Sequence, residues 1–157
     1  MNAIIKIKDY GTITATLCKE EAPLTVDHFI KLAKSGFYNG LTFHRIIKGF
    51  MIQGGDPKGN GTGGSGHTIK GEFKANGINN GLSHKRGTLS MARALDFNSA
   101  DSQFFIMHKD GEFLDGQYAA FGKVIEGIEV VDKIASVRTT PSDRPVEPVI
   151  IESITIK

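Results

Sequence analysis

Short runs in which apolar and polar residues alternate, bounded by glycines, recur along the chain and predict strands. In Thr12–Cys18, Ile13, Ala15 and Leu17 fall on one face and threonines fall on the other, a pattern typical of an antiparallel sheet with one buried face. Together with Ala3–Lys8 this run predicts a hairpin. The other predicted strands are Leu41–Ile47, Phe50–Gln53, Thr88–Ala92, Gln103–His108, Ala119–Val124 and Val149–Ile156.

Two segments have a helical period instead. In Ala22–Gly36 an apolar stripe recurs at three- and four-residue steps, Pro23 suits the first turn, and Gly36 is a stop signal. A shorter stripe predicts a second helix over Gly127–Ala135. About eight short strands with two helices indicate a mainly β fold and favour a closed or nearly closed antiparallel barrel.

Composition narrows the class of protein. A length of 157 residues predicts a single domain, residues 1–157. The net charge of +2 is too balanced for a protein whose main task is to bind nucleic acid. The one cysteine excludes a disulfide framework. Lysines interrupt the apolar residues of Met1–Lys8, so we expect neither a signal peptide nor a membrane span, and a cytoplasmic protein.

The densest motif lies in residues 43–56. Strand alternation predicts that Phe43 and Arg45 point to one side and that His44 points to the other, where we expect it to be buried and hydrogen-bonded. By the same rule Gln53 shares a face with Met51.

A second cluster, Ser102–Ile106, has the same character, because Gln103 and Phe105 share a face. If the two faces meet, they form an apolar pocket with Arg45 and two glutamines at its edge, which is the general form of a ligand site.

These residues resemble the cyclophilin family of peptidyl-prolyl cis-trans isomerases, and the short connection before Leu41 is similar to that of its bacterial members. The resemblance is collinear over nearly the whole chain. It rests on the segments Phe43–Arg45, Gln53–Asp56, Gly61–Gly64, Leu89–Ala92, Ser102–Ile106, Leu114–Gly116 and Phe121–Val124. It implies an eight-stranded antiparallel barrel capped by two helices, with the site on the outer face of the barrel.

The resemblance also implies roles for single residues. The family's catalytic arginine falls on Arg45, which would donate a hydrogen bond to the prolyl nitrogen in the twisted transition state. The proline pocket falls on Phe50, Met51, Phe105 and Leu114. The contacts to the peptide fall on Gln53, Ala92, Arg93 and Gln103.

Three positions of the site depart from the best-known eukaryotic members. Phe113 replaces a tryptophan and Tyr118 replaces a histidine, and both are expected at the rim. Arg93 replaces an asparagine, whose role is through its backbone groups. Because the indole N–H is lost, we expect weak binding of cyclosporin-type macrocycles.

The implied activity is acceleration of X–Pro rotation in unfolded or flexible chains, and thereby assistance to folding. It needs no metal or cofactor, and we expect neither. The expected partners are proline-containing peptides, and the protein is expected to be a monomer. One alternative is a non-catalytic proline-peptide binding module or chaperone on the same scaffold. Another is a nucleotide-dependent enzyme that uses Gly59–Gly64, although the strand and helix that a dinucleotide loop needs are missing from the pattern.

Overall fold

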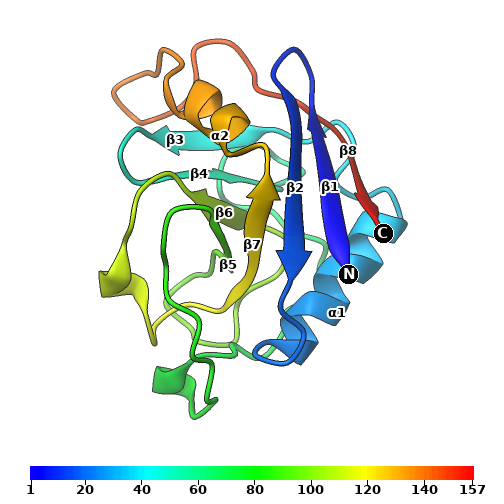
Figure 1. Cartoon of the computed structure of the whole chain (residues 1–157), viewed down its shortest axis with the longest axis vertical. Coiled ribbons are helices and arrows are strands. Elements are labelled where there is room, and N and C mark those ends of the chain that lie inside the picture. The colour runs from blue at the N-terminus through cyan, green and yellow to red at the C-terminus, as the bar shows by residue number, and fades with distance from the viewer.

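The computed structural model describes all 157 residues and contains eight strands, two α-helices and two short 3-10 helices (Figure 1). The strands are β1 (Asn2–Ile7), β2 (Gly11–Leu17), β3 (Phe43–Ile47), β4 (Met51–Gly54), β5 (Thr88–Met91), β6 (Phe104–Met107), β7 (Ala120–Glu126) and β8 (Ile151–Ile156). The helices are α1 (Pro23–Lys34), α2 (Ile128–Ala135), η1 (Lys74–Asn76) and η2 (Glu112–Leu114). The predicted strands and helices are thus all present, with ends that differ by one or two residues.

All strands belong to one antiparallel sheet, in the order β3-β4-β6-β5-β7-β2-β1-β8. The sheet curls so that its two edges approach each other, and α1 and α2 lie at opposite ends of the curl (Figure 1). The mainly β, eight-stranded, two-helix prediction is therefore confirmed.

The closed barrel is wrong, because no ladder joins the edge strands β3 and β8. Only a single bridge, Thr42 with Ile150, and a few backbone bonds beside it connect the two edges. Beyond that point the Ile46 N–H donates to the carbonyl of Asp143 at 2.8 Å. The loop before β8 thus takes the outer edge of β3, and Pro148 in that loop has no N–H to offer. The sheet remains open at this seam.

The inside of the curl holds a core of 29 buried residues. Phe29 of α1 packs edge-on against Phe104 of β6, with ring centroids 5.5 Å apart, so the helix closes one end of the core. Side chains alternate along β4 and β6, and the opposite face of these strands carries a smaller apolar cluster outside the curl. The sheet therefore has apolar residues on both faces, and only the outer cluster is available to a ligand.

The first turn of α1 is capped from a distant segment. Its N-cap residue, Ala22, has no side chain that could cap the helix. The carboxylate of Glu72, which is buried, accepts hydrogen bonds from the Thr25 N–H at 2.6 Å, the Thr25 hydroxyl at 2.7 Å and the Leu24 N–H at 3.2 Å. A negative charge at a helix N-terminus is favourable, so Glu72 fixes the long 55–87 connection to the end of α1.

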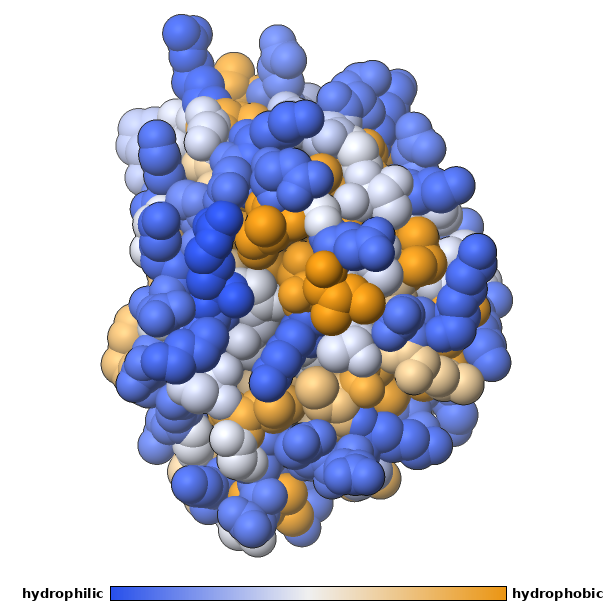
Figure 2. Space-filling model, viewed as in Figure 1, coloured by the Kyte–Doolittle hydropathy of each residue, from blue (hydrophilic) through white to orange (hydrophobic).

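Polar residues cover most of the face shown in Figure 2, and apolar atoms reach its surface mainly near the middle. The large apolar side chains that are exposed are Met1, Leu24, Leu95, Phe113, Ile125 and Val146. Neither helix is long and apolar enough to span a bilayer.

Removal of the Glu72 carboxylate, which caps α1 from a distant segment, should destabilise the folded protein. We expect Glu72→Ala to lower the free energy of unfolding by about 1–3 kcal/mol, because it leaves the buried N–H and hydroxyl donors of Thr25 without an acceptor. Urea unfolding monitored by circular dichroism measures this loss. The control is Glu152→Ala, since Glu152 is exposed on β8 and its loss should change little. Equal effects of the two substitutions would contradict the capping role.

Candidate functional site

A β-bulge in β3 sets the position of Arg45. Phe43 pairs with Gly54 and Arg45 pairs with Gln53, which are neighbours on β4, so His44 is one extra residue in β3. A bulge of this kind shifts the alternation of side chains by one residue.

The shift separates Phe43 from Arg45. Phe43 and Ile46 both enter the inner core, whereas Arg45 is exposed on the outer face. The prediction that Phe43 and Arg45 share a face is therefore wrong. It assumed that side chains alternate without interruption along the strand, and the bulge interrupts them. The bulge allows one short strand to anchor itself in the core and still present a cation outside.

Arg45 lies at the edge of an apolar pocket of about 170 Å³ on the outer face. The residues that line this pocket are Arg45, Phe50, Met51, Gln53, Ala92, Arg93, Phe105, Leu114 and Tyr118. They come from β3, the turn between β3 and β4, β4, β6, η2 and the loops after β5 and η2. The outer cluster supplies its floor through Met51, Phe105 and Leu114, which are at least nine-tenths buried.

The two other predicted residues lie beside the pocket. Phe113 is 73% exposed, and its ring centroid is 5.7 Å from that of Phe50, so it extends the rim outward. Gln103 lines the neighbouring pocket. The structure thus brings the predicted site residues into one region, with two of them outside the apolar cavity itself.

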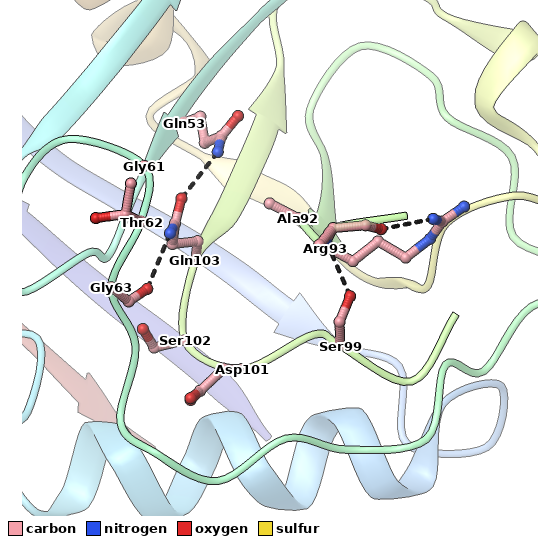
Figure 3. Close-up of a pocket in the computed structure, with 11 residues that line it drawn as sticks. Gln53, Gly61, Thr62, Gly63, Ala92, Arg93, Ser99, Asp101, Ser102 and Gln103 are labelled. Atoms are coloured by element: carbon pink, nitrogen blue, oxygen red, sulfur yellow. Dashed lines mark hydrogen bonds between the residues drawn. The ribbon is translucent and has the colours of Figure 1, made fainter. Parts of the chain in front are cut away.

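A chain of amide hydrogen bonds holds Arg45 in place. Nη1 of Arg45 donates to Oε1 of Gln53 at 3.3 Å, and Nε2 of Gln53 donates to Oε1 of Gln103 at 3.0 Å. Nε2 of Gln103 then donates to the carbonyl of Gly63 at 2.9 Å (Figure 3). The chain uses one N–H of the guanidinium and leaves the others free to donate to a ligand.

The glycine-rich loop that ends this chain is organised around Asp56. The carboxylate of Asp56 accepts hydrogen bonds from the N–H groups of Lys58, Asn60 and Gly61. Burial alone would raise the pKa of Asp56, but these backbone donors outweigh it and hold the pKa below its ordinary value. Three N–H groups of the loop are therefore already used inside the protein, and no helix follows the loop directly. These contacts favour a structural loop beside the site.

A second pocket of about 220 Å³ adjoins the first and is mainly polar (Figure 3). The two pockets share Gln53, Ala92 and Arg93. Ser99 and Asp101 in its wall were missed by the sequence analysis, because loop residues have no periodicity to assign them a face. Their only signal was proximity to Ala92–Arg93 and Gln103 along the chain.

A buried polar group supports the back of the apolar pocket. The ring of Phe105 stacks on His84, with centroids 6.1 Å apart. Nδ1 of His84 lies 2.8 Å from Oδ1 of Asp115, and Nε2 lies 2.8 Å from Oγ of Ser90. The order resembles a nucleophilic triad, but Ser90 and His84 have no exposed surface, so no substrate reaches the hydroxyl. The group instead makes a rigid support for Phe105.

Three histidines have pKa values below the ordinary range. Burial is the main cause at His44, His84 and His108, and nearby carboxylates offset it only in part. His44 is buried as expected, but neither ring nitrogen has a hydrogen-bond partner, so the expectation that it is hydrogen-bonded is wrong. No group of three or more histidine, cysteine, aspartate or glutamate side chains is placed to bind one metal ion.

His108 connects the site to α2. The Gly49 N–H, in the turn between β3 and β4, donates to Nδ1 of His108 at 2.9 Å. Nε2 of the same ring lies 3.1 Å from Oδ1 of Asp132 on α2. Because Nδ1 accepts, the neutral ring carries its proton on Nε2. Protonation would turn Nδ1 into a second donor and remove its bond to the Gly49 turn.

The lowered pKa values of these three histidines predict that the folded protein is less stable in acid. A histidine whose pKa is lowered by folding binds fewer protons in the folded protein, so stability falls as the pH drops below 6.5, the ordinary histidine value. Urea unfolding should therefore give a lower free energy near pH 5 than at neutral pH. His84→Gln should weaken this pH dependence, whereas His67→Gln, at an exposed histidine, should not. Equal stability of the wild type at both pH values would contradict the prediction.

Comparison with known proteins agrees with this geometry. Residues 3–156 match the family described as "Cyclophilin type peptidyl-prolyl cis-trans isomerase/CLD". The chain is 44% identical over 147 residues to peptidyl-prolyl cis-trans isomerase CYP18-1 of Arabidopsis thaliana, covering 93% of this chain and 90% of that one. It is 49% identical over 126 residues to a peptidyl-prolyl cis-trans isomerase of Helicobacter pylori, covering 79% and 74% of the two chains.

Among solved structures, a Cryptosporidium parvum cyclophilin type peptidyl-prolyl cis-trans isomerase, crystallised in the presence of the dipeptide Ala-Pro, superposes with a TM-score of 0.91. The two chains are 35% identical, and the match covers 100% of this chain and 99% of that one. This chain thus shares its fold with that isomerase over its whole length. The chain belongs to the cyclophilin-type peptidyl-prolyl cis-trans isomerase family.

Proposed function

We propose that this protein is an enzyme that accelerates cis-trans rotation about X–Pro bonds, and that Arg45 is its catalytic residue. The observation that carries the proposal is the position of Arg45 at the edge of the 170 Å³ apolar pocket, with guanidinium N–H groups that have no partner in the protein. Family membership and relatives named as peptidyl-prolyl isomerases support the reaction.

Rotation about an X–Pro bond needs little more than a fixed hydrogen-bond donor beside an apolar pocket. Rotation breaks amide resonance over a barrier of about 18–20 kcal/mol, and no covalent bond forms or breaks. In the twisted state the prolyl nitrogen becomes pyramidal and gains a lone pair, which accepts a hydrogen bond that the planar amide accepts poorly. A fixed guanidinium therefore binds the transition state more tightly than the ground state and accelerates the reaction. Arginine suits this task because it stays charged and its donors lie in a rigid plane.

The other pocket residues hold the substrate while the bond turns. Phe50, Met51, Phe105 and Leu114 would enclose the proline ring, since they form the apolar walls. The backbone N–H and C=O of Arg93 make no hydrogen bond within the protein, so an extended peptide can pair with them. With the ring and one flank of the peptide fixed, rotation is confined to the remaining side of the bond.

A non-catalytic proline-binding module or chaperone on the same scaffold would need the pocket but not the arginine. Gln53 and Gln103 hold Arg45 at the pocket through hydrogen bonds, and a mere binding site has no use for a cation fixed in this way. The enzyme is therefore the better interpretation.

The wider setting of this activity is also proposed. Residues 1–157 would act as one domain and as a monomer in the cytoplasm, on proline-containing segments of unfolded or flexible chains, without a metal or cofactor. Assistance to protein folding is the role that fits such substrates, because uncatalysed X–Pro exchange takes tens to hundreds of seconds.

Substitutions at Arg45 test the catalytic role. We expect Arg45→Ala to lower kcat/KM about a hundredfold while the dissociation constant of a short Ala-Pro peptide changes only slightly, since a preorganised donor at developing charge contributes about 2.7–4 kcal/mol. Arg45→Lys should also lose most of the activity, because an ammonium group lacks the planar fork. NMR exchange spectroscopy measures both quantities without a coupled protease. The control is Arg138→Ala, at an exposed arginine outside the pocket. An unchanged exchange rate in Arg45→Ala would leave a binding module as the function.

The rim predicts weak binding of cyclosporin-type macrocycles. Phe113 offers no hydrogen-bond donor where an indole N–H would lie, and one hydrogen bond contributes about 0.5–1.5 kcal/mol. Inhibition by cyclosporin should therefore strengthen up to about tenfold in Phe113→Trp, with little change in peptide turnover. Tight inhibition of the wild type, unaltered in Phe113→Trp, would show that the missing donor does not limit binding.

A further inference from the structure

The half-buried Arg93 side chain donates hydrogen bonds from all three guanidinium nitrogens and lies against three aromatic rings. We propose that Arg93 is a positioning residue: its guanidinium joins two walls of the apolar pocket and thereby sets the affinity for the peptide, while Arg45 sets the rate of rotation. This inference rests on the proposed function, and it concerns the side chain of Arg93 rather than the backbone groups that face the ligand.

The guanidinium donates to backbone carbonyls of two segments. Nε and Nη2 donate to the carbonyl of Gln117 at 3.2 and 2.7 Å, in the loop after η2. Nη1 donates to the carbonyl of Ala94 at 2.9 Å and more weakly to that of Leu95 at 3.4 Å. The planar fork thus ties the 93–95 segment to the segment that carries Tyr118, and a point charge could not hold both at once.

Three aromatic rings surround the same guanidinium. Its central carbon lies 4.5 Å from the ring centroid of Tyr118, 4.9 Å from that of Phe97 and 5.1 Å from that of Phe73. Each distance is within the range of a cation–π interaction. The rings come from three separate segments, so the cation is the point at which these segments meet.

The two segments joined in this way are both pocket walls. Ala92 and Arg93 line both pockets, and Tyr118 lines the apolar one, where its ring packs edge-on against Phe105 at 5.9 Å. A second tie on the loop side, from the Ala94 N–H to the Ser99 hydroxyl at 2.9 Å, secures the far end of the 93–95 segment. The Arg93 guanidinium thus acts as a clamp between these two segments. Without this clamp, the backbone edge at Arg93 that would pair with the peptide and the Tyr118 ring that lines the pocket lose their common support.

The side chain does not reach the ligand itself. In Figure 3 the guanidinium extends away from Gln53 and Gln103, and each of its three nitrogens already donates to a carbonyl. A direct contact with the reacting bond is therefore not its role. Its role is instead to set the geometry of the backbone edge at Arg93 that would pair with the peptide. This geometry affects the binding of the ground state and of the transition state alike. Uniform binding of this kind changes KM and leaves kcat in place.

The test is the division of the effect between affinity and rate. For a short Ala-Pro peptide, NMR titration gives the dissociation constant, and exchange spectroscopy at saturation gives the rate on the enzyme. In Arg93→Ala we expect the dissociation constant to rise about tenfold, equivalent to about 1.4 kcal/mol, while the rate at saturation changes less than twofold. Arg93→Lys keeps a cation among the rings but loses the fork, so its dissociation constant should lie between those of Arg93→Ala and the wild type. Arg138→Ala is the matched control and should equal the wild type.

Each outcome decides a separate question. If the wild type does not accelerate exchange, the proposed function itself fails. If the wild type is active, an unchanged dissociation constant in Arg93→Ala overturns the clamp, and so does a loss confined to the rate at saturation. If Arg93→Ala does not fold, Arg93→Lys decides: affinity equal to that of the wild type would show that the fork is not needed.

Discussion

One extra residue in β3 determines on which face of the sheet Arg45 lies. With unbroken alternation, Phe43 and Arg45 would point into the same face, and either a charge would enter the core or a phenylalanine would leave it. Burial of an ion without a partner costs several kcal/mol, and full burial of a phenylalanine stabilises by about 1.5–3 kcal/mol. The bulge at His44 meets both demands, since Phe43 and Ile46 enter the core and Arg45 stays outside. The pocket, the glutamine chain and the pairing edge are all arranged around the point where Arg45 emerges.

Alternation predicted most of this fold because it reports burial directly. In β2 and in Ser102–Ile106 the predicted faces agree with the burial found, and α1 buries most of its predicted stripe. The failures share one origin. A bulge, the tie between β3 and the loop at Asp143, and the missing partners of His44 all depend on residues far apart in the sequence. No local pattern contains that information, so neither the open seam nor the orientation of Phe43 relative to Arg45 could be predicted.

The residues of the site differ in the same way, since some could be placed from local sequence patterns and others could not. Residues on strands, such as Met51, Gln53 and Phe105, have a face that alternation assigns, and the family resemblance then gives them a role. Arg93 lies in a loop, and its sequence position indicates nothing about its side chain. Only the packing of three aromatic rings around the guanidinium and its bond to the carbonyl of Gln117 show what that side chain holds.

In the proposed mechanism a single donor is effective only while it is held in the right place. One preorganised donor lowers a barrier by roughly 2.7–4 kcal/mol, which is about a hundredfold to a thousandfold in rate. That gain depends on how firmly the pocket holds the proline ring and the peptide flank, because a substrate that shifts carries the prolyl nitrogen away from the guanidinium. Rigidity is therefore part of the chemistry. The structure supplies it on every side of the pocket: His84 supports Phe105 from behind, Gln53 and Gln103 steady Arg45, His108 fixes the Gly49 turn, and Arg93 joins the remaining walls. An arginine on a flexible surface loop would present the same charge and achieve little, since its donors would follow the substrate through ground and transition states alike.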